Sequence, residues 1–142
     1  LEFFGVDQRH ESDIEGLGRI PAEQQMKSTK VPSFNVIGNS PLVLRESLLD
    51  EVYKMGENFV EAAKRVVSPG MNGPFCIEGV YDENAKFTSF EFSARIVAGT
   101  NIYMDGSPYY SLLFNENMSM GKRIAREIKT AEEKNQIEKI VT

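Results

Sequence analysis

The sequence predicts an α+β domain in which an antiparallel sheet is flanked by helices. Residues 74–97 carry two strand-like runs around a turn-rich centre, a pattern typical of a β-hairpin. Residues 45–67 and 119–135 carry apolar residues at spacings of three and four, which is typical of amphipathic helices. In chain order we expect strand, loop, strand, helix, hairpin and helix, an order that favours antiparallel pairing.

Length and composition fit one domain over residues 1–142. The chain is 41% hydrophobic and 26% charged, as in an ordinary soluble globular protein. Its net charge of −5 without a basic block argues against a nucleic-acid partner, and no apolar run is long enough to span a membrane. The single cysteine, Cys76, excludes an internal disulfide and fits the reducing cytoplasm. Because the chain opens with Leu1 rather than Met, we interpret it as part of a longer polypeptide.

The N-terminal region is predicted to be a strand over residues 1–6 followed by a polar loop over residues 7–19. Two interpretations of this loop stay open. It is either a solvated connector or a loop that faces a phosphate or substrate, since Arg9 and Arg19 offer forked donors suited to phosphate and carboxylate groups. Residues 21–27 are predicted to form a short helix with Pro21 in its first turn.

The middle of the chain is predicted as a short strand at residues 33–37, a turn at 38–41 and the long helix at 45–67. Gly56 in that helix costs about 1 kcal/mol relative to alanine, which leaves a kink or two abutting helices open. Ser119 is the expected N-cap of the final helix. The helices are better explained by core packing than by chemistry.

The hairpin holds the one unexpected charge pattern. Glu78 lies in the first arm where an apolar residue is expected, and the second arm carries Glu91, Ser93 and Arg95 on one alternating face. If a four-residue loop over residues 83–86 closes the hairpin, Glu78 lies directly opposite Glu91. Like charges roughly 4.5–5.5 Å apart destabilise a sheet, so we expect a shared proton or a hard divalent cation between the two carboxylates.

Three kinds of chemistry remain open from the residues alone. Two carboxylates with the Ser93 hydroxyl would offer oxygen ligands to Mg²⁺, and Arg95 could neutralise a phosphoryl group. The carboxylate pair could instead perform the acid–base work of a glycosidase, although the chain lacks the tryptophans of a sugar-binding platform. The third interpretation is a solvated hairpin face with Arg95 as the counter-charge.

At this point the residues carry a resemblance. Glu78, thirteen positions before Glu91-x-Ser-x-Arg, resembles the last part of the ATP-grasp site. Longer strings are similar to the C-terminal part of the archaeal formate-dependent 5-formaminoimidazole-4-carboxamide ribonucleotide synthetases. These strings are DQRHESDIEGLGRIPAEQ, VIGNSPLVLRESLLDEVYKMGENFVEAAK, PGMNGPFCIE, FEFSARIVAGTNIYMDGSPY and SMGKRIAREIK. The resemblance covers essentially the whole chain.

The resemblance implies a C-terminal ATP-grasp subdomain of a ligase in purine synthesis. The family uses ATP and formate, through formyl phosphate, to formylate the 5-amino group of aminoimidazole carboxamide ribonucleotide. Carried over by position, the resemblance implies Glu78 and Glu91 as ligands of Mg²⁺ or Mn²⁺, Glu11 at the ATP pocket, Asn39 at the ribonucleotide, Arg95 at the phosphate or acyl phosphate, and Arg9 and Arg19 as anion contacts to the substrate. Ser93 departs from the superfamily pattern, which has Asn there.

The resemblance also implies a limit. The phosphate-covering loop, the adenine-binding hinge and the N-terminal substrate domain would lie upstream of Leu1, so we expect the chain alone to lack synthetase activity. The family generally forms homo-oligomers. Two other classes remain open: an ATP-grasp ligase for another carboxylate and amine, and a non-catalytic interaction module with an acidic surface.

Overall fold

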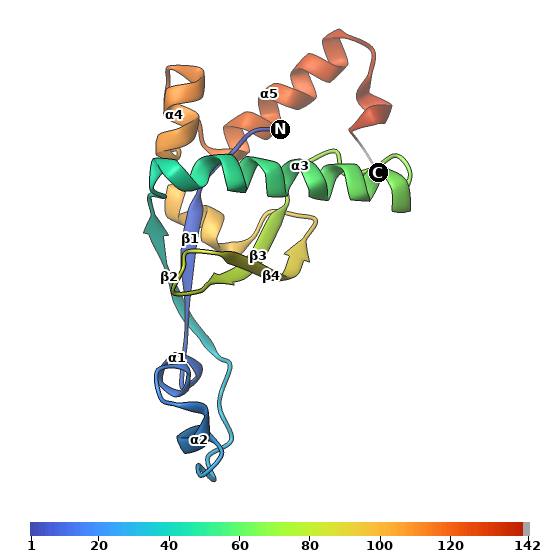
Figure 1. The fold of residues 1–142 in the computed structure, drawn as a ribbon. Helices are drawn as coiled ribbons and strands as arrows, with labels where there is room; N and C mark the ends of the chain where they lie inside the picture. Colours follow the sequence, from blue (N-terminus) through green and yellow to red (C-terminus); the bar gives the residue numbers. More distant parts are fainter. Residues whose placement is uncertain (141–142) are drawn as a thin grey trace.

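In a computed structural model, which describes residues 1–140 apart from the side chain of Glu15, the chain forms two antiparallel strand pairs flanked by helices (Figure 1). One pair is β1 (Val6–Glu11) with β2 (Val36–Leu42), and the other is β3 (Cys76–Tyr81) with β4 (Phe87–Ser93). The predicted α+β class with antiparallel pairing is confirmed. The strands form two separate two-stranded sheets, where we expected one.

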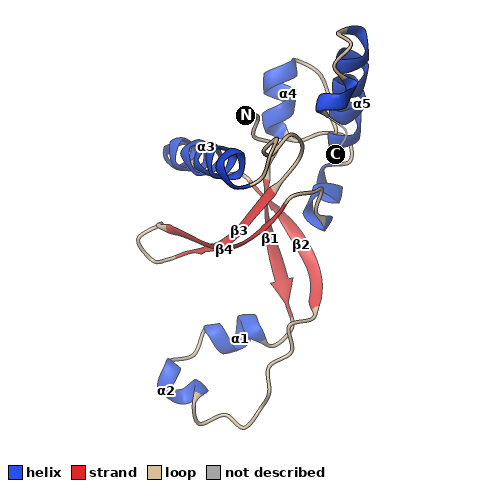
Figure 2. Cartoon of the chain, turned by 90° about the vertical axis from the view of Figure 1, so that its right-hand side faces the viewer, coloured by secondary structure: helices blue, strands red, loops and turns tan. Residues whose placement is uncertain are grey.

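The helices lie at both ends of β1 and β2. Short helices α1 (Ile14–Gly18) and α2 (Ala22–Gln25) lie beyond one end, whereas the longer helices gather around the other end (Figures 1 and 2). The remaining helices are η1 (Glu46–Leu48), α3 (Leu49–Val66), η2 (Ala98–Tyr103), α4 (Pro108–Phe114), α5 (Met120–Glu133) and η3 (Ile137–Lys139). No helix within residues 1–140 is both long enough and apolar enough to cross a membrane.

The first strand does not lie where we predicted it. Residues 1–5 form no strand, and β1 occupies residues that we expected to be a polar loop. The apolar character of residues 1–5 serves packing instead: the Phe3 ring lies 4.6 Å from that of Tyr109, and the Phe4 ring lies 4.8 Å from that of Tyr110. The polar composition of residues 7–11 led us to predict a loop, although β1 places its polar side chains against other polar groups.

The second strand was also displaced in the prediction. β2 runs through Gly38 and Pro41, which we interpreted as a turn. β2 has a single partner strand, so one of its edges makes no ladder hydrogen bonds. A strand of this kind tolerates Pro41, which has no N–H group to donate, because the ladder need not use that position.

The two long helices are confirmed. α3 continues through Gly56 without interruption, and a Cβ atom at this buried glycine would lie 2.8 Å from Cδ2 of Leu1. Gly56 therefore allows close packing rather than producing a kink. α5 begins after Ser119, whose side chain accepts a hydrogen bond from the backbone N–H of Lys122 at 3.2 Å, as predicted.

We predicted no helix at α4, because Ser107 and Pro108 are residue types that also favour turns. They form a helix start instead: Ser107 is the N-cap and accepts a hydrogen bond from the backbone N–H of Tyr110 at 3.1 Å, and Pro108 occupies the first turn. The predicted short helix after Pro21 is confirmed as α2, with Pro21 as its N-cap. A last helical turn, η3, follows α5 at the end of the described residues.

The buried core lies where the N-terminal segment meets α4 and α5. Met118 and Ser107 are fully buried and Tyr110 is 4% exposed. Glu2 accepts two hydrogen bonds from the Arg123 guanidinium, at 2.8 and 2.9 Å, which fasten the N-terminal segment to α5. These bonds hold the pKa of the Glu2 carboxyl below its ordinary value.

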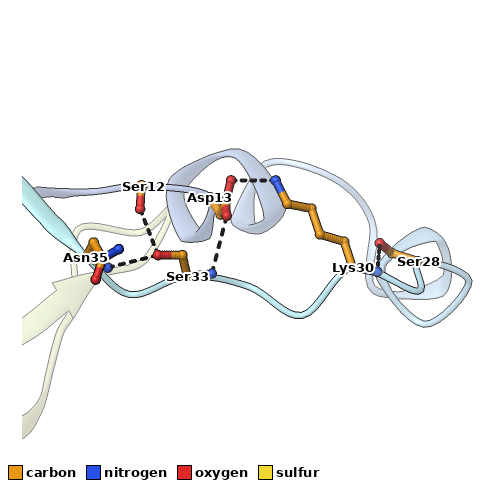
Figure 3. Close-up of polar contacts among 6 residues, drawn as sticks. All are labelled: Ser12, Asp13, Ser28, Lys30, Ser33 and Asn35. Carbon is orange, nitrogen blue, oxygen red and sulfur yellow. Dashed lines mark hydrogen bonds and ion pairs between the residues drawn. The ribbon is translucent and has the colours of Figure 1, made fainter.

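Residues 12–35, which we call the arm, connect β1 to β2. Its base is closed by polar contacts (Figure 3): the Asp13 carboxylate accepts from Nζ of Lys30 at 2.7 Å and from the backbone N–H of Ser33 at 3.4 Å. Oγ of Ser12 also donates to Oγ of Ser33 at 3.1 Å. The arm therefore leaves the strand pair as a closed loop.

Candidate functional site

The hairpin places Glu78 opposite Glu91, as predicted. Their Cα atoms are paired in the antiparallel register of β3 and β4. The predicted loop was one residue too short, since the ladder ends at Tyr81 and Phe87 and the loop spans residues 82–86. A β-bulge compensates: Gly79 pairs with Ser89 while Glu78 pairs with Glu91, so β4 contains one extra residue at that point.

The bulge changes which side chains share a face. Cross-strand partners lie on the same face of a sheet, so Gly79 and Ser89 lie on one face and Glu78 and Glu91 on the other. Regular alternation along the second hairpin strand, as we predicted it from Glu91 onward, would put Ser89 on the face of Glu91, and the bulge breaks it there. Gly79 is required here because a Cβ atom would overlap both the ring of Phe87 and the carbonyl oxygen of Thr88.

The second strand of the hairpin is also shorter than predicted. β4 ends at Ser93, and Arg95 lies in the bend that follows, with Nη1 donating to the carbonyl oxygen of Ile96 at 2.7 Å. Ser93 remains on the face of Glu91, because it pairs with Cys76 two positions along the ladder. The hairpin thus presents Cys76, Glu78, Glu91 and Ser93 together.

β1 and β2 present a complementary set of polar groups. Asp7, Arg9 and Glu11 occupy alternate positions of β1, and Arg9 pairs with Asn39 of β2. Nδ2 of Asn39 donates to Oδ2 of Asp7 at 2.5 Å, and Nη1 of Arg9 lies 3.5 Å from Oε1 of Glu11. One face of this strand pair therefore alternates acidic, basic and amide groups.

An ion pair joins the two sheets. Nη2 of Arg9 lies 3.1 Å from Oε2 of Glu78, and the Glu78 side chain is 17% exposed. Both views show β3 and β4 crossing close to β1 and β2 (Figure 2). We call this group the intersheet site; its members are Asp7, Arg9, Glu11, Asn39, Glu78 and Glu91.

The pKa of the Cys76 thiol reflects the charges of the intersheet site. Burial raises the pKa of its thiol to about 11, and the carboxylates of Glu78 and Asp7 act in the same direction. The guanidinium groups of Arg9 and Arg95 oppose them. Arg95 therefore lies within electrostatic range of the site, although it makes no ion pair with the described residues.

Five of the seven predicted site residues come together in the intersheet site: Arg9, Glu11, Asn39, Glu78 and Glu91. Arg19 does not, because it ends α1 on the arm, beyond the far end of β1 (Figure 1). Its predicted contact with substrate, like the roles of the other residues, stays a prediction.

The donor set of the hairpin fits a hard divalent cation. Mg²⁺ is commonly held by one or two carboxylates together with phosphate oxygens and water, and Glu78 and Glu91 supply two carboxylates from paired positions. Within residues 1–140 no three His, Cys, Asp or Glu side chains gather into a metal-binding cluster. An ion bound here would therefore take its other ligands from a substrate such as ATP.

Sequence reasoning missed Asp7 and Gly99. Asp7 was assigned to a loop, because residues 7–11 are all polar and show none of the apolar–polar alternation that signals a strand. Gly99 is buried in η2, and a Cβ atom there would overlap the carboxyl group of Asp7. No local signal in the sequence indicates this contact, because 92 positions separate the two residues.

The other side of the hairpin lies beside α3. The ring of Phe92 lies 5.0 Å from that of Phe59, and an open groove of about 670 Å³ lies between the two elements. Phe90 and Phe92 are 67% and 60% exposed. The groove is lined by apolar side chains together with Glu51, Lys54, Ser89 and Glu91, so the exposed Glu91 borders it.

The whole chain is similar to known proteins. A family model described as "Domain of unknown function (DUF1297)" matches residues 1–142. A protein of Nitrosopumilus maritimus named 5-formaminoimidazole-4-carboxamide-1-(beta)-D-ribofuranosyl 5'-monophosphate synthetase is 88% identical over 142 residues, which are 100% of this chain and 42% of that protein. A protein of the same name from Archaeoglobus fulgidus is 50% identical over 99% of this chain and 39% of its own length.

A solved structure agrees. The crystal structure of an IMP biosynthesis protein PurP from Thermococcus kodakaraensis superposes with a TM-score of 0.78 at 33% identity, covering 99% of this chain and 44% of that one. These comparisons confirm the resemblance inferred from the sequence. The chain spans about two fifths of the length of the curated relatives it matches.

Proposed function

This chain belongs to the DUF1297 family, and on that premise we propose that it is the C-terminal ATP-grasp part of a longer formate-dependent ribonucleotide synthetase. In this proposal residues 1–142 form a single domain. The observation that carries it is the pairing of Glu78 with Glu91, with Arg9 of the other sheet 3.1 Å from Glu78. Two carboxylates beside a guanidinium are suited to an ion and the phosphates that it accompanies.

The proposed reaction is an ATP-dependent formation of a C–N bond. Formate attacks the γ-phosphoryl group of ATP and gives formyl phosphate and ADP. The 5-amino group of aminoimidazole carboxamide ribonucleotide then attacks the formyl carbon, phosphate leaves, and the amine loses a proton. The names of the relatives, which are synthetases of the formylated ribonucleotide, support this choice of product.

The residues of the intersheet site, together with Arg95 and Arg19, would have different roles in this reaction. Glu78 and Glu91 would hold Mg²⁺ or Mn²⁺, which when bound neutralises phosphate charge. Arg9, already directed at Glu78, would contact phosphate or substrate anions, and Asn39 would contact the ribonucleotide. Glu11 would lie at the ATP pocket. Arg95 would stabilise the charge of the transferred phosphoryl group from the bend after β4, and Arg19 would be an anion contact from the arm.

The chain requires other parts of the enzyme for catalysis. It spans about two fifths of the curated relatives, and in ATP-grasp enzymes the nucleotide lies between two subdomains. We propose that a missing N-terminal part covers the phosphates and binds adenine, so that residues 1–142 alone release no ADP. Assembly into a homo-oligomer belongs to the same proposal.

The test is the formation of ADP by the full-length protein with each substrate omitted in turn. We expect ADP only when formate and aminoimidazole carboxamide ribonucleotide are both present with ATP and Mg²⁺. Equal ADP formation without either one would reject the function. Dependence on a different carboxylate and amine would instead identify another ATP-grasp ligase. ADP release by residues 1–142 alone would contradict the proposed division of the site.

A further inference from the structure

The shortest polar contact of the intersheet site joins Asp7 to Asn39. Nδ2 of Asn39 donates to Oδ2 of Asp7 at 2.5 Å, and both side chains are partly buried. The two residues come from different strands: Asn39 pairs with Arg9, and Asp7 lies two positions before Arg9 on the same face. This diagonal contact therefore exists only in the folded strand pair.

The chemistry of the contact fixes the orientation of the Asn39 amide. An ionised carboxylate accepts hydrogen bonds and cannot donate, so the NH₂ group of Asn39 must face Asp7. The amide is planar, with its oxygen on the other side of the carbon from its nitrogen. Oδ1 of Asn39 is consequently directed away from Asp7 as an acceptor.

Asp7 is itself held in place. Gly99 lies against it, and a Cβ atom at that position would overlap the Asp7 carboxyl group. η2, which contains Gly99, is fastened to β1 by the Tyr103 hydroxyl, which donates to the carbonyl oxygen of Val6 at 2.7 Å. The close approach of backbone to carboxylate limits the positions that Asp7 can adopt.

We propose that Asp7 is a positioning residue that fixes the Asn39 amide, so that Oδ1 of Asn39 accepts a hydrogen bond from an N–H or O–H group of the ribonucleotide. The inference rests on the proposed function, which places the ribonucleotide at Asn39. It adds the polarity of the contact: the substrate supplies the donor. Asp7 makes no contact with the reacting atoms in this proposal.

The experiment compares four variants of the full-length protein with the wild type in steady-state kinetics, with ribonucleotide and ATP varied separately. Asp7→Asn removes the constraint, because an amide at position 7 can donate as well as accept and allows both orientations of Asn39. Asn39→Asp places two carboxylates in contact. The double variant with Asp7→Asn and Asn39→Asp restores one donor and one acceptor and keeps an acceptor oxygen at position 39. Asp105→Asn, at an exposed position in a turn, is the matched control.

For Asp7→Asn we expect the KM for the ribonucleotide to rise roughly tenfold or more, as for a lost hydrogen bond to a charged group, with kcat and the KM for ATP changed much less. Asn39→Asp should raise that KM further, and the double variant should recover at least tenfold of that loss. Asp105→Asn should match the wild type. A purely structural role of Asp7 would move kcat and both KM values together.

Two results overturn the inference while leaving the proposed function intact: Asp7→Asn behaving like Asp105→Asn, or a double variant no better than Asn39→Asp alone. The double variant also covers the case in which a single variant fails to fold, since it restores the hydrogen bond. If the wild type forms ADP without regard to the ribonucleotide, the proposed function fails first and the role of Asp7 falls with it.

Discussion

The two strand pairs of this chain have the same antiparallel geometry and different arrangements of charge. In β1–β2 unlike groups adjoin, since Asp7 accepts from Asn39 and Arg9 lies beside Glu11. In β3–β4 two glutamates are paired across the ladder, and the only ion pair that either makes among residues 1–140 is to Arg9 of the other sheet. The first pair contains a positive charge, Arg9, beside its own carboxylates, whereas the paired glutamates of the second rely on that same Arg9 from outside.

The difference indicates which strand pair is organised for a ligand. Like charges on paired residues destabilise a sheet, so β3–β4 bears a cost that β1–β2 does not. Glu78 contacts Arg9 of β1, whereas its ladder partner Glu91 is exposed and borders the groove beside α3, where Phe92 packs against Phe59. A cation between the glutamates would remove the repulsion, which is the basis of the predictions that follow.

The largest effect is expected from removing both carboxylates. In the full-length protein, Glu78→Gln with Glu91→Gln should lower ADP formation roughly a hundredfold or more and abolish its response to Mg²⁺, because the phosphate charge loses its counter-ion. The measurement is ADP release over a Mg²⁺ titration. Glu57→Gln with Glu83→Gln is the matched control, because both side chains are exposed and the same charge is removed. Catalysis and Mg²⁺ dependence that survive would favour the non-catalytic interaction module.

The next effect concerns Cys76, whose pKa is raised by carboxylates from both strand pairs. Because burial and the nearby carboxylates raise the pKa of its thiol to about 11, its thiolate fraction at pH 8 is about a hundredfold below that of an ordinary cysteine. We expect Cys76 to react correspondingly slowly with an alkylating reagent, measured by mass spectrometry of its peptide, and to react faster as the pH approaches 11. Glu78→Gln should lower the pKa of this thiol and speed the reaction, and Asp7→Asn should do so less.

The denatured protein supplies the control rate for that measurement. Alkylation of Cys76 at the same rate in folded and denatured protein would show that the thiol is not buried beside the carboxylates of the intersheet site. Equal rates in wild type and Glu78→Gln would show that the glutamate does not act on it.

The third effect tests whether the β1–β2 pair depends on close packing against η2. Gly99→Ala should lower the free energy of unfolding by roughly 1–3 kcal/mol, since the added methyl group overlaps the carboxyl group of Asp7. The loss should be smaller in an Asp7→Ala background, and this coupling can be measured by urea unfolding in a double-mutant cycle. Gly121→Ala in α5 is the control, because a Cβ atom there meets nothing within 4 Å. Additive effects of the two substitutions would disprove the contact.

The same two strand pairs show how far the sequence allowed prediction. Alternation and helical spacing predicted the hairpin, α3, α5 and the pairing of Glu78 with Glu91. That pairing was correct because two errors cancelled: the loop is one residue longer than expected, and the bulge adds one residue to β4. Bulges leave little trace in composition, although Gly79 marks this one.

The remaining part of the site depends on contacts between distant residues. β1 was hidden because its polar residues suggested a loop, and its stability comes from pairing with β2 across the arm. The contacts of Asp7 with Asn39 and with Gly99 join residues far apart in the chain, which no local pattern specifies. Resemblance to a family pointed to Asn39 and Glu11, but only the folded chain places them beside Arg9 and Glu78.

The smallest effect distinguishes the contribution of Glu78 to stability from that of Glu91. Glu91→Gln removes the repulsion and keeps the ion pair between Arg9 and Glu78, so the free energy of unfolding should rise by a few tenths of a kcal/mol. Glu78→Gln removes the repulsion together with that ion pair, so the gain should be offset and the stability should equal or fall below the wild-type value. Urea unfolding of the full-length protein in the presence of a chelator measures both, with Glu83→Gln as the control on the same hairpin. If both substitutions stabilised the protein equally, Arg9 would contribute nothing to Glu78, and the charges of the two strand pairs would be independent.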